Sequence, residues 1–132
     1  MILLDTLGEL SACWGLAEIA FVGGSLSTRG GQNMLEPCAA GAAVVVGPNT
    51  WNFRHAVELL TGAGGLAVVP SADELAATIR RLLTDSLAAE RMRHASREAI
   101  QLQQGATGLT VELLVSSLPT LLDCTEGQRA AA

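Results

Sequence analysis

Four short apolar runs most constrain the fold of this 132-residue chain. They cover residues 2–4, 20–22, 43–46 and 66–69, and none of them alternates apolar with polar side chains. Strands of a parallel sheet that is covered on both faces have this pattern, because neither face meets water. We therefore predict four buried, parallel strands.

Helical patterns separate these runs. They cover residues 9–18, 34–40 and 52–60, and further helices are predicted from a Ser71 cap, over 86–103 and over 107–118. Gly41 and Gly62 stand where helix C-terminal caps are expected, and Glu74 lies at the capping-box position relative to Ser71. The alternation of strands with helices predicts a Rossmann-like α/β fold with a helical C-terminal segment.

The domain organisation follows from this order. We expect one nucleotide-binding α/β domain over residues 1–132, with residues 71–120 as its helical C-terminal part. Domains of this type usually have about five or six strands, so we expect an incomplete domain whose missing strands lie upstream of Met1. Open sheet edges favour strand pairing between chains. A non-catalytic fragment that forms a homodimer through its open edge is therefore the alternative function.

Composition excludes several classes. The formal net charge is -5 and every basic residue is arginine, which argues against nucleic-acid binding. No apolar run approaches the roughly 20 residues of a membrane span, so we expect a soluble chain. Cys13, Cys38 and Cys124 form no CxxC pair and are expected to be buried, reduced thiols. His55 and His94 lack partners at metal-ligand spacing, so neither a metal nor a cofactor is predicted.

A glycine-rich loop follows the second apolar run. Gly23 and Gly24 begin it, Gly30 and Gly31 end it, and a helix pattern then carries Glu36 about one turn in. Ligands of α/β sheets bind at the carboxyl ends of strands. Glycines let backbone amides approach an anion there, and a helix N-terminus adds unpaired N–H groups. A carboxylate beside them can accept hydrogen bonds from vicinal hydroxyls, as on a ribose.

A purely structural explanation of the same residues stays open. The glycines would make tight turns, Asn33 would cap the helix, and Glu36 would complement the helix dipole. The dinucleotide fingerprint G-x-G-x-x-G is absent from the first strand-to-helix turn. Ser25 has no His or Asp at triad spacing, so nucleophilic catalysis is not predicted.

Five motifs in order carry a resemblance to a known family. They are DTLGEL, AEIAFVGGSL, GGQNMLEP, GPNTWNF and a late QGA. Together they resemble the C-terminal part of 3-deoxy-D-manno-octulosonic acid (Kdo) transferase, a GT-B glycosyltransferase, from residue 3 to about residue 118. The resemblance implies the transfer of Kdo from CMP-Kdo to a lipid A precursor in lipopolysaccharide biosynthesis, at the cytoplasmic side of the bacterial inner membrane.

The resemblance also implies a role for each site residue. The turn formed by Gly8, Glu9 and Leu10 should lie near the cytosine, and Glu36 should hold the ribose hydroxyls. The phosphate should be surrounded by Gly23, Gly24, Ser25, Gly31, Gln32 and Asn33. Gln32 and Asn49 stand where the family usually has histidine.

The catalytic base and the lipid acceptor site of this family belong to its N-terminal domain. Inverting sugar transfer requires a base that activates the acceptor hydroxyl, and no residue of this chain is a candidate. We therefore expect an enzyme in the parent protein, no catalytic residue in this chain, and no activity from the chain alone.

Overall fold

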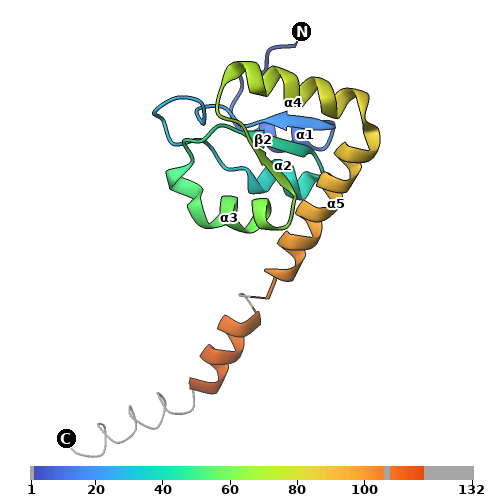
Figure 1. The fold of residues 1–132 in the computed structure, drawn as a ribbon. Coiled ribbons are helices and arrows are strands. Elements are labelled where there is room, and N and C mark those ends of the chain that lie inside the picture. The colour runs from blue at the N-terminus through green and yellow to red at the C-terminus, as the bar shows by residue number, and fades with distance from the viewer. Residues whose placement is uncertain (1, 106–107, 118–132) are drawn as a thin grey trace, which may run out of the picture. The chain divides into compact units, whose positions relative to one another are not determined.

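The computed structural model describes residues 2–105 and 108–117. The chain divides into two compact units, residues 1–101 and residues 102–132, and each is described here by itself. The first unit holds a sheet and the helices around it (Figure 1). The single domain predicted over residues 1–132 stays a prediction.

A three-stranded parallel sheet forms the centre of the first unit. Its strands are β1 (Ile19–Phe21), β2 (Ala43–Val46) and β3 (Leu66–Val68). They lie side by side in chain order, with Ala20 beside Val44 and Val44 beside Leu66. The parallel α/β class is confirmed, and the described residues contain three strands where four were predicted.

The missing strand is the apolar run at residues 2–4, and that prediction was wrong. Ile2 and Leu3 are 97% and 82% exposed, and the segment has no regular structure. An apolar run becomes a strand only where a neighbouring strand takes up its backbone hydrogen bonds. Within the described residues, β1 pairs with β2 alone and does not accept this segment.

The helices follow the predicted order, with shifted ends. They are α1 (Leu10–Trp14), α2 (Leu35–Ala40), the 3-10 turn η1 (Trp51–Phe53), α3 (Arg54–Gly62), α4 (Ala72–Thr84) and α5 (Ser86–Leu102). The first helix is shorter than predicted, because Gly15 follows it and glycine disfavours helix continuation. In the second unit, residues 108–117 are helical. Both ends of the helix predicted over 107–118 lie outside the described residues.

Two of the three predicted caps are confirmed. The Ser71 hydroxyl accepts a hydrogen bond from the Glu74 N–H at 3.2 Å. Gly41 ends α2 in the left-handed conformation, with a φ of 96°. Gly62 is instead the last residue of α3, which is capped by Ala63 in a right-handed conformation.

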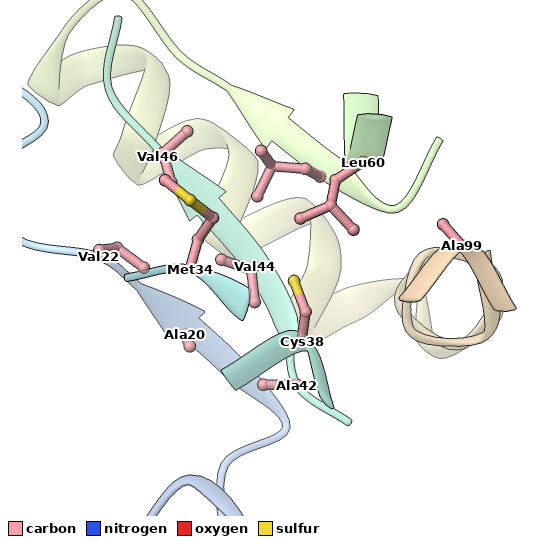
Figure 2. Close-up of a cluster of buried hydrophobic side chains, with 10 residues drawn as sticks. Ala20, Val22, Met34, Cys38, Ala42, Val44, Val46, Leu60 and Ala99 are labelled. Carbon is pink, nitrogen blue, oxygen red and sulfur yellow. The ribbon is translucent and has the colours of Figure 1, made fainter. Parts of the chain in front are cut away.

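Helices cover both faces of the sheet. On one face, Ala20, Val44 and Leu66 pack against residues of α2, α3 and the second half of α5 (Figure 2). On the other face, Ala43 and Val45 pack against α4 and the first half of α5. Figure 1 shows α4 along one side of the sheet and α2 with α3 along the other. Helices therefore cover both faces, which explains why the strands do not alternate, although Val68 at the end of β3 is 42% exposed.

The cysteines differ in environment. Cys38 lies in the core, as predicted, and burial raises the pKa of its thiol to about 12, a shift that a hydrogen bond with the Ser96 side chain reduces. Its thiol is therefore protonated and unreactive at neutral pH. Cys13 is exposed on α1, so its predicted burial was wrong. Cys124 lies outside the described residues.

Glycines let α5 approach the sheet closely. A Cβ on Gly65 would lie 2.5 Å from the backbone nitrogen of Ser96 and 2.6 Å from its Cα. At the end of α2, the guanidinium of Arg97 lies against Gly41 and donates to the carbonyl of Ala40 at 3.4 Å. These contacts fix α5 against the core.

The approach at Gly65 predicts a stability difference between two glycine substitutions. Gly65→Ala should lower the free energy of unfolding by roughly 1–3 kcal/mol, because a methyl group would overlap the backbone of α5, which cannot move aside cheaply. Urea denaturation followed by circular dichroism measures the change.

Gly62→Ala is the matched control. Nothing lies within 4 Å of a Cβ at this position, which is helical. Alanine there should raise the free energy of unfolding by about 0.4–1 kcal/mol. Equal unfolding midpoints for the two variants would contradict the packing described for α5.

Candidate functional site

The loops that follow β1 and β2 lie at the same edge of the sheet. The strands are parallel, so their carboxyl ends point the same way, and ligands of such sheets bind at this edge. The loop after β1 covers residues 22–34 and contains most of the predicted site residues. The loop after β2 covers residues 47–50 and leads into η1.

The side chain of Ser25 joins the two loops. Its hydroxyl donates to the carbonyl of Val22 at 2.6 Å and accepts a hydrogen bond from the Gly47 N–H at 2.8 Å. The backbone carbonyl of Ser25 accepts a further bond from the Asn49 N–H at 2.9 Å. Ser25 is fully buried, so its hydroxyl serves the protein itself. The phosphate contact that the sequence predicts for Ser25 stays a prediction, and neither the hydroxyl nor the N–H of this residue is exposed.

Gly47 makes this junction sterically possible. A Cβ at this position would lie 2.4 Å from the carbonyl oxygen of Ser25 and 2.6 Å from the nitrogen of Leu26. Backbone atoms cannot yield as a flexible side chain does. The prediction did not include Gly47 among the site residues, although a glycine directly after a buried strand was a visible signal.

The two glycine pairs close the first loop. Gly24 and Gly31 have φ values of 77° and 75°. A Cβ on Gly24 would lie 3.7 Å from the Cα of Gly31, so the two ends of the loop almost touch. Gly30, with a φ of 85°, lies against the side chains of Trp51 and Asn52, which a Cβ would meet at 2.6–2.7 Å. The glycines thus serve positive φ and close packing, and the loop is held on both sides.

Glu36 lies at the exit of this loop, in the first turn of α2. The side-chain amide of Asn33 donates to Oε1 of Glu36 at 2.9 Å, and the Asn33 Oδ1 accepts a bond from the Leu35 N–H at 3.0 Å. Glu36 is exposed. The N-cap of α2 is Met34, without a side-chain cap hydrogen bond, so the cap predicted at Asn33 was wrong by one residue. Asn33 instead accepts from the Leu35 N–H just before the helix and also contacts the carboxylate.

The α2 helix has six residues. A helix this short has a small macrodipole, because only aligned peptide units add to it. The predicted contribution of the helix N-terminus to anion binding is therefore weak. An anion at this edge would depend on the loop amides and on the exposed side chain of Arg29 in the same loop, where Gly23 and Gln32 are exposed as well.

The turn formed by Gly8, Glu9 and Leu10 leads into α1, of which Leu10 is the first residue. Gly8 has a φ of 92°, and the hydroxyl of Thr6 donates to the carboxylate of Glu9. All three predicted residues are exposed. Helix α1 packs against α2, which connects this turn to the element that carries Glu36.

A hollow of about 220 Å³ lies elsewhere, beside α5. It is lined by Gly41, Glu90, Arg93, His94 and Arg97, and contains none of the predicted site residues. Gly41 precedes β2 while Gly47 follows it, so the hollow lies toward the opposite end of the sheet. The side chain of His94 is 80% exposed and its Nδ1 lies 3.8 Å from Oε2 of Glu98, on a solvated face of α5.

The described residues offer neither a metal cluster nor a membrane span. No set of three or more His, Cys, Asp or Glu side chains within residues 2–105 and 108–117 is arranged to hold a metal ion. In the same part of the chain, no helix combines the length and the apolarity that a bilayer crossing requires.

Comparisons with known proteins agree with the class of fold described above. No family model matches the chain. Over 86% of its length, the chain is 38% identical to the 3-deoxy-D-manno-octulosonic acid transferase of Bordetella pertussis, of which it covers 27%. Its identity to the transferase of the same name from Haemophilus influenzae is also 38%, with the same coverage of 86% and 27%.

A solved structure has the same fold. The crystal structure of the C-terminal CMP-Kdo binding domain of WaaA from Acinetobacter baumannii matches with a TM-score of 0.71 and 29% sequence identity. The match covers 74% of this chain and 51% of that one.

The fold and these matches define the class of the chain, which is an α/β domain of the kind that forms the C-terminal domain of GT-B glycosyltransferases. More closely, the chain is a homologue of the C-terminal part of Kdo transferase. It spans about a quarter of the length of the curated relatives that it matches, 27% in both cases. The resemblance found in the sequence is confirmed, and the roles of the individual site residues stay predictions.

The junction at Ser25 predicts a clear stability effect. Ser25→Ala should lower the free energy of unfolding by about 1–3 kcal/mol, because the buried Gly47 N–H would lose its partner. Ser27→Ala is the control, since the Ser27 hydroxyl donates to the Gly24 carbonyl at an exposed position, and its effect should stay within about 0.5 kcal/mol. Denaturation curves that shift equally for both variants would contradict a structural role of Ser25.

Proposed function

We propose that this chain binds the sugar nucleotide CMP-Kdo as the donor-binding part of a Kdo transferase. Its homology to proteins named Kdo transferase supports the proposal. So does its similarity to the CMP-Kdo binding domain of WaaA, which extends over most of the chain. The reaction class of the parent protein would be glycosyl transfer.

The phosphate of the nucleotide would lie over the glycine loop after β1. Gly23 and Gln32 are exposed on that loop, while Ser25 and Gly31 are buried beneath it. A loop whose backbone is already fixed loses little conformational entropy when it binds an anion. Neutral backbone dipoles can hold a phosphate in this way without a cationic side chain.

The exposed carboxylate of Glu36 is the observation that carries the proposal. It lies directly after the fixed loop, at the ligand-binding edge of the sheet, and Asn33 holds one of its oxygens. Its second oxygen is free to accept hydrogen bonds from a pair of vicinal hydroxyls, which a ribose offers. The turn from Gly8 to Leu10 would lie near the cytosine, as the family resemblance implies.

The rest of the reaction would belong to the longer parent protein. The lipid A precursor would bind to an N-terminal domain, and that domain would also supply the base that activates the acceptor hydroxyl. The transfer would take place at the cytoplasmic side of the bacterial inner membrane. In this division of roles, the chain described here orients the donor and has no catalytic residue of its own.

Titration with CMP tests the donor site directly. In ¹⁵N-resolved NMR spectra, CMP should shift the amide signals of residues 23–36. Glu36→Gln should weaken binding roughly 10- to 100-fold, because a hydrogen bond to a charged acceptor contributes about 1.5–3 kcal/mol. Calorimetry with the same ligand measures the two affinities.

Glu58→Gln provides the matched control. Glu58 is an exposed carboxylate on α3, and its substitution removes the same charge without touching the proposed site. Its affinity for CMP should equal that of the unaltered chain. The proposal fails if millimolar CMP leaves the signals of residues 23–36 unchanged, or if Glu36→Gln binds as tightly as Glu58→Gln.

Self-association through the open edge of the sheet is a second candidate, favoured by the geometry of β1. The carbonyl of Glu18 and the N–H of Val22 bond to β2. Because strand groups alternate in direction with a period of two, the N–H groups of Ile19 and Phe21 point to the open edge. A second copy of the chain would find a row of hydrogen-bonding groups there.

Hydrogen exchange at different concentrations tests this second candidate. In an edge-paired homodimer, the amides of Ile19 and Phe21 should exchange more slowly as the concentration rises, while sedimentation velocity reports a dimer. The amide of Val22, which already bonds to β2, serves as the internal reference. A monomer whose edge amides exchange at the same rate throughout the concentration series would exclude this mode of association.

A further inference from the structure

Asn33 uses both ends of its side-chain amide. Its Oδ1 accepts from the Leu35 N–H at 3.0 Å, and its Nδ2 donates to the Glu36 Oε1 at 2.9 Å. The orientation of the amide follows from these partners, because a backbone N–H can only donate and an ionised carboxylate can only accept. Asn33 therefore connects the backbone at the start of α2 with the carboxylate of the proposed site.

The two bonds differ in what they require. An oxygen that caps the Leu35 N–H is available from Asp and Ser as well as from Asn. The bond to Glu36 needs a donor, which an ionised Asp side chain cannot provide, whereas a hydroxyl can, as that of Thr6 does toward Glu9 three residues on. A residue needed only as a cap would therefore be replaceable by Asp, whereas one needed to hold Glu36 would not.

The surroundings keep Asn33 in place. Met34, the next residue, is fully buried in the core cluster, and Gly31 is buried beneath the loop with its φ of 75°. Glu36 itself is exposed and has three rotatable side-chain bonds. The side-chain amide of Asn33 thus connects the side chain of Glu36, which can rotate about three bonds, to a fixed part of the backbone.

We propose that Asn33 is a positioning residue that holds the Glu36 carboxylate for a vicinal diol, so that the site selects ribonucleotides over 2′-deoxyribonucleotides. This inference rests on the proposed function and assigns Asn33 a role different from the phosphate contact expected from the sequence. With Oε1 held by the amide, Oε2 is presented to the ligand in one direction. A ligand that lacks the 2′-hydroxyl would lose one of the bonds that this orientation prepares.

The test compares CMP with 2′-deoxy-CMP on the unaltered chain, on Asn33→Asp and on Asn33→Ala, by calorimetry. Asn33→Asp keeps an oxygen for the Leu35 N–H and loses the donor to Glu36, and Asn33→Ala loses both. The ratio of the two dissociation constants is the readout, because repulsion between the carboxylate introduced by Asn33→Asp and the phosphate affects both ligands alike and cancels. Gln101→Glu, on an exposed position of α5, controls for the added charge of the Asn33→Asp variant.

The unaltered chain should prefer CMP, and both Asn33 variants should reduce this preference roughly three- to tenfold. The reduction is expected because the Glu36 carboxylate, no longer held by Asn33, would have to be ordered during binding. Gln101→Glu should keep the full preference. A chain that binds both nucleotides equally well before any substitution would remove the proposed role of Glu36 as well. A preference that survives in Asn33→Asp would overturn the positioning role alone and leave the donor site intact.

A measurement without any substitution guards against variants that fold poorly. Three-bond couplings of the Glu36 side chain in the free protein report whether χ1 occupies one rotamer. We expect a single rotamer, as the bond to Asn33 requires. Couplings averaged over several rotamers would show that Asn33 does not hold the carboxylate, and would overturn the inference.

Discussion

The buried hydroxyl of Ser25 is the contact on which the geometry of this edge depends. It joins the loop after β1 to the start of the loop after β2 through Gly47, 22 residues further along the chain. The hydroxyl both donates and accepts, so it satisfies the Val22 carbonyl and the Gly47 N–H together. Two loops that would otherwise move independently become one rigid border of the sheet. Every proposal about ligand binding here presupposes that border.

Buried and exposed residues have separate tasks at this border. Ser25, Gly31 and Met34 are buried and fix the backbone, and Gly23 and Glu36 are exposed where a ligand would arrive. The glycines reconcile the two tasks, since positive φ and close backbone contact bring buried anchors and exposed groups within a few residues of one another. The structural explanation of the glycines is therefore correct, and it is compatible with a binding site at the same loop.

Sequence patterns predicted the elements that depend on local chemistry. The strand over 43–46 was predicted at its observed bounds, and the caps at Gly41 and Ser71 follow from rules that involve only neighbouring residues. The predicted strand at 2–4 failed because a strand also needs a partner, which periodicity does not reveal. Gly62 was misjudged as a cap because Ala63 extends the turn in a right-handed conformation.

The candidate site, like the fold, was predicted only in part. The sequence located the glycine loop and Glu36, because both stand next to a recognisable strand. It could not show that the Ser25 hydroxyl faces inward, since that depends on Gly47 in another loop. The role of Asn33 was also hidden, because a cap and a contact to a carboxylate three residues on look identical in a sequence. The structure therefore adds two kinds of information, hydrogen-bond partners that lie far apart in the sequence and residues that make two contacts at once.

The charge of the chain places a further constraint on how a nucleotide would be recognised. With a formal net charge of -5, the chain offers no long-range attraction to an anionic ligand, and Glu36 adds a negative charge beside the proposed phosphate position. Recognition would therefore arise close to the loop, where amide dipoles and the exposed guanidinium of Arg29 act over short distances. Neutral donors suit this position better than cations, since a cation close to Glu36 would pair with the carboxylate and occupy the oxygen that the diol needs. The Asn33 amide avoids that conflict, because it binds one oxygen of Glu36 and leaves the other to the ligand.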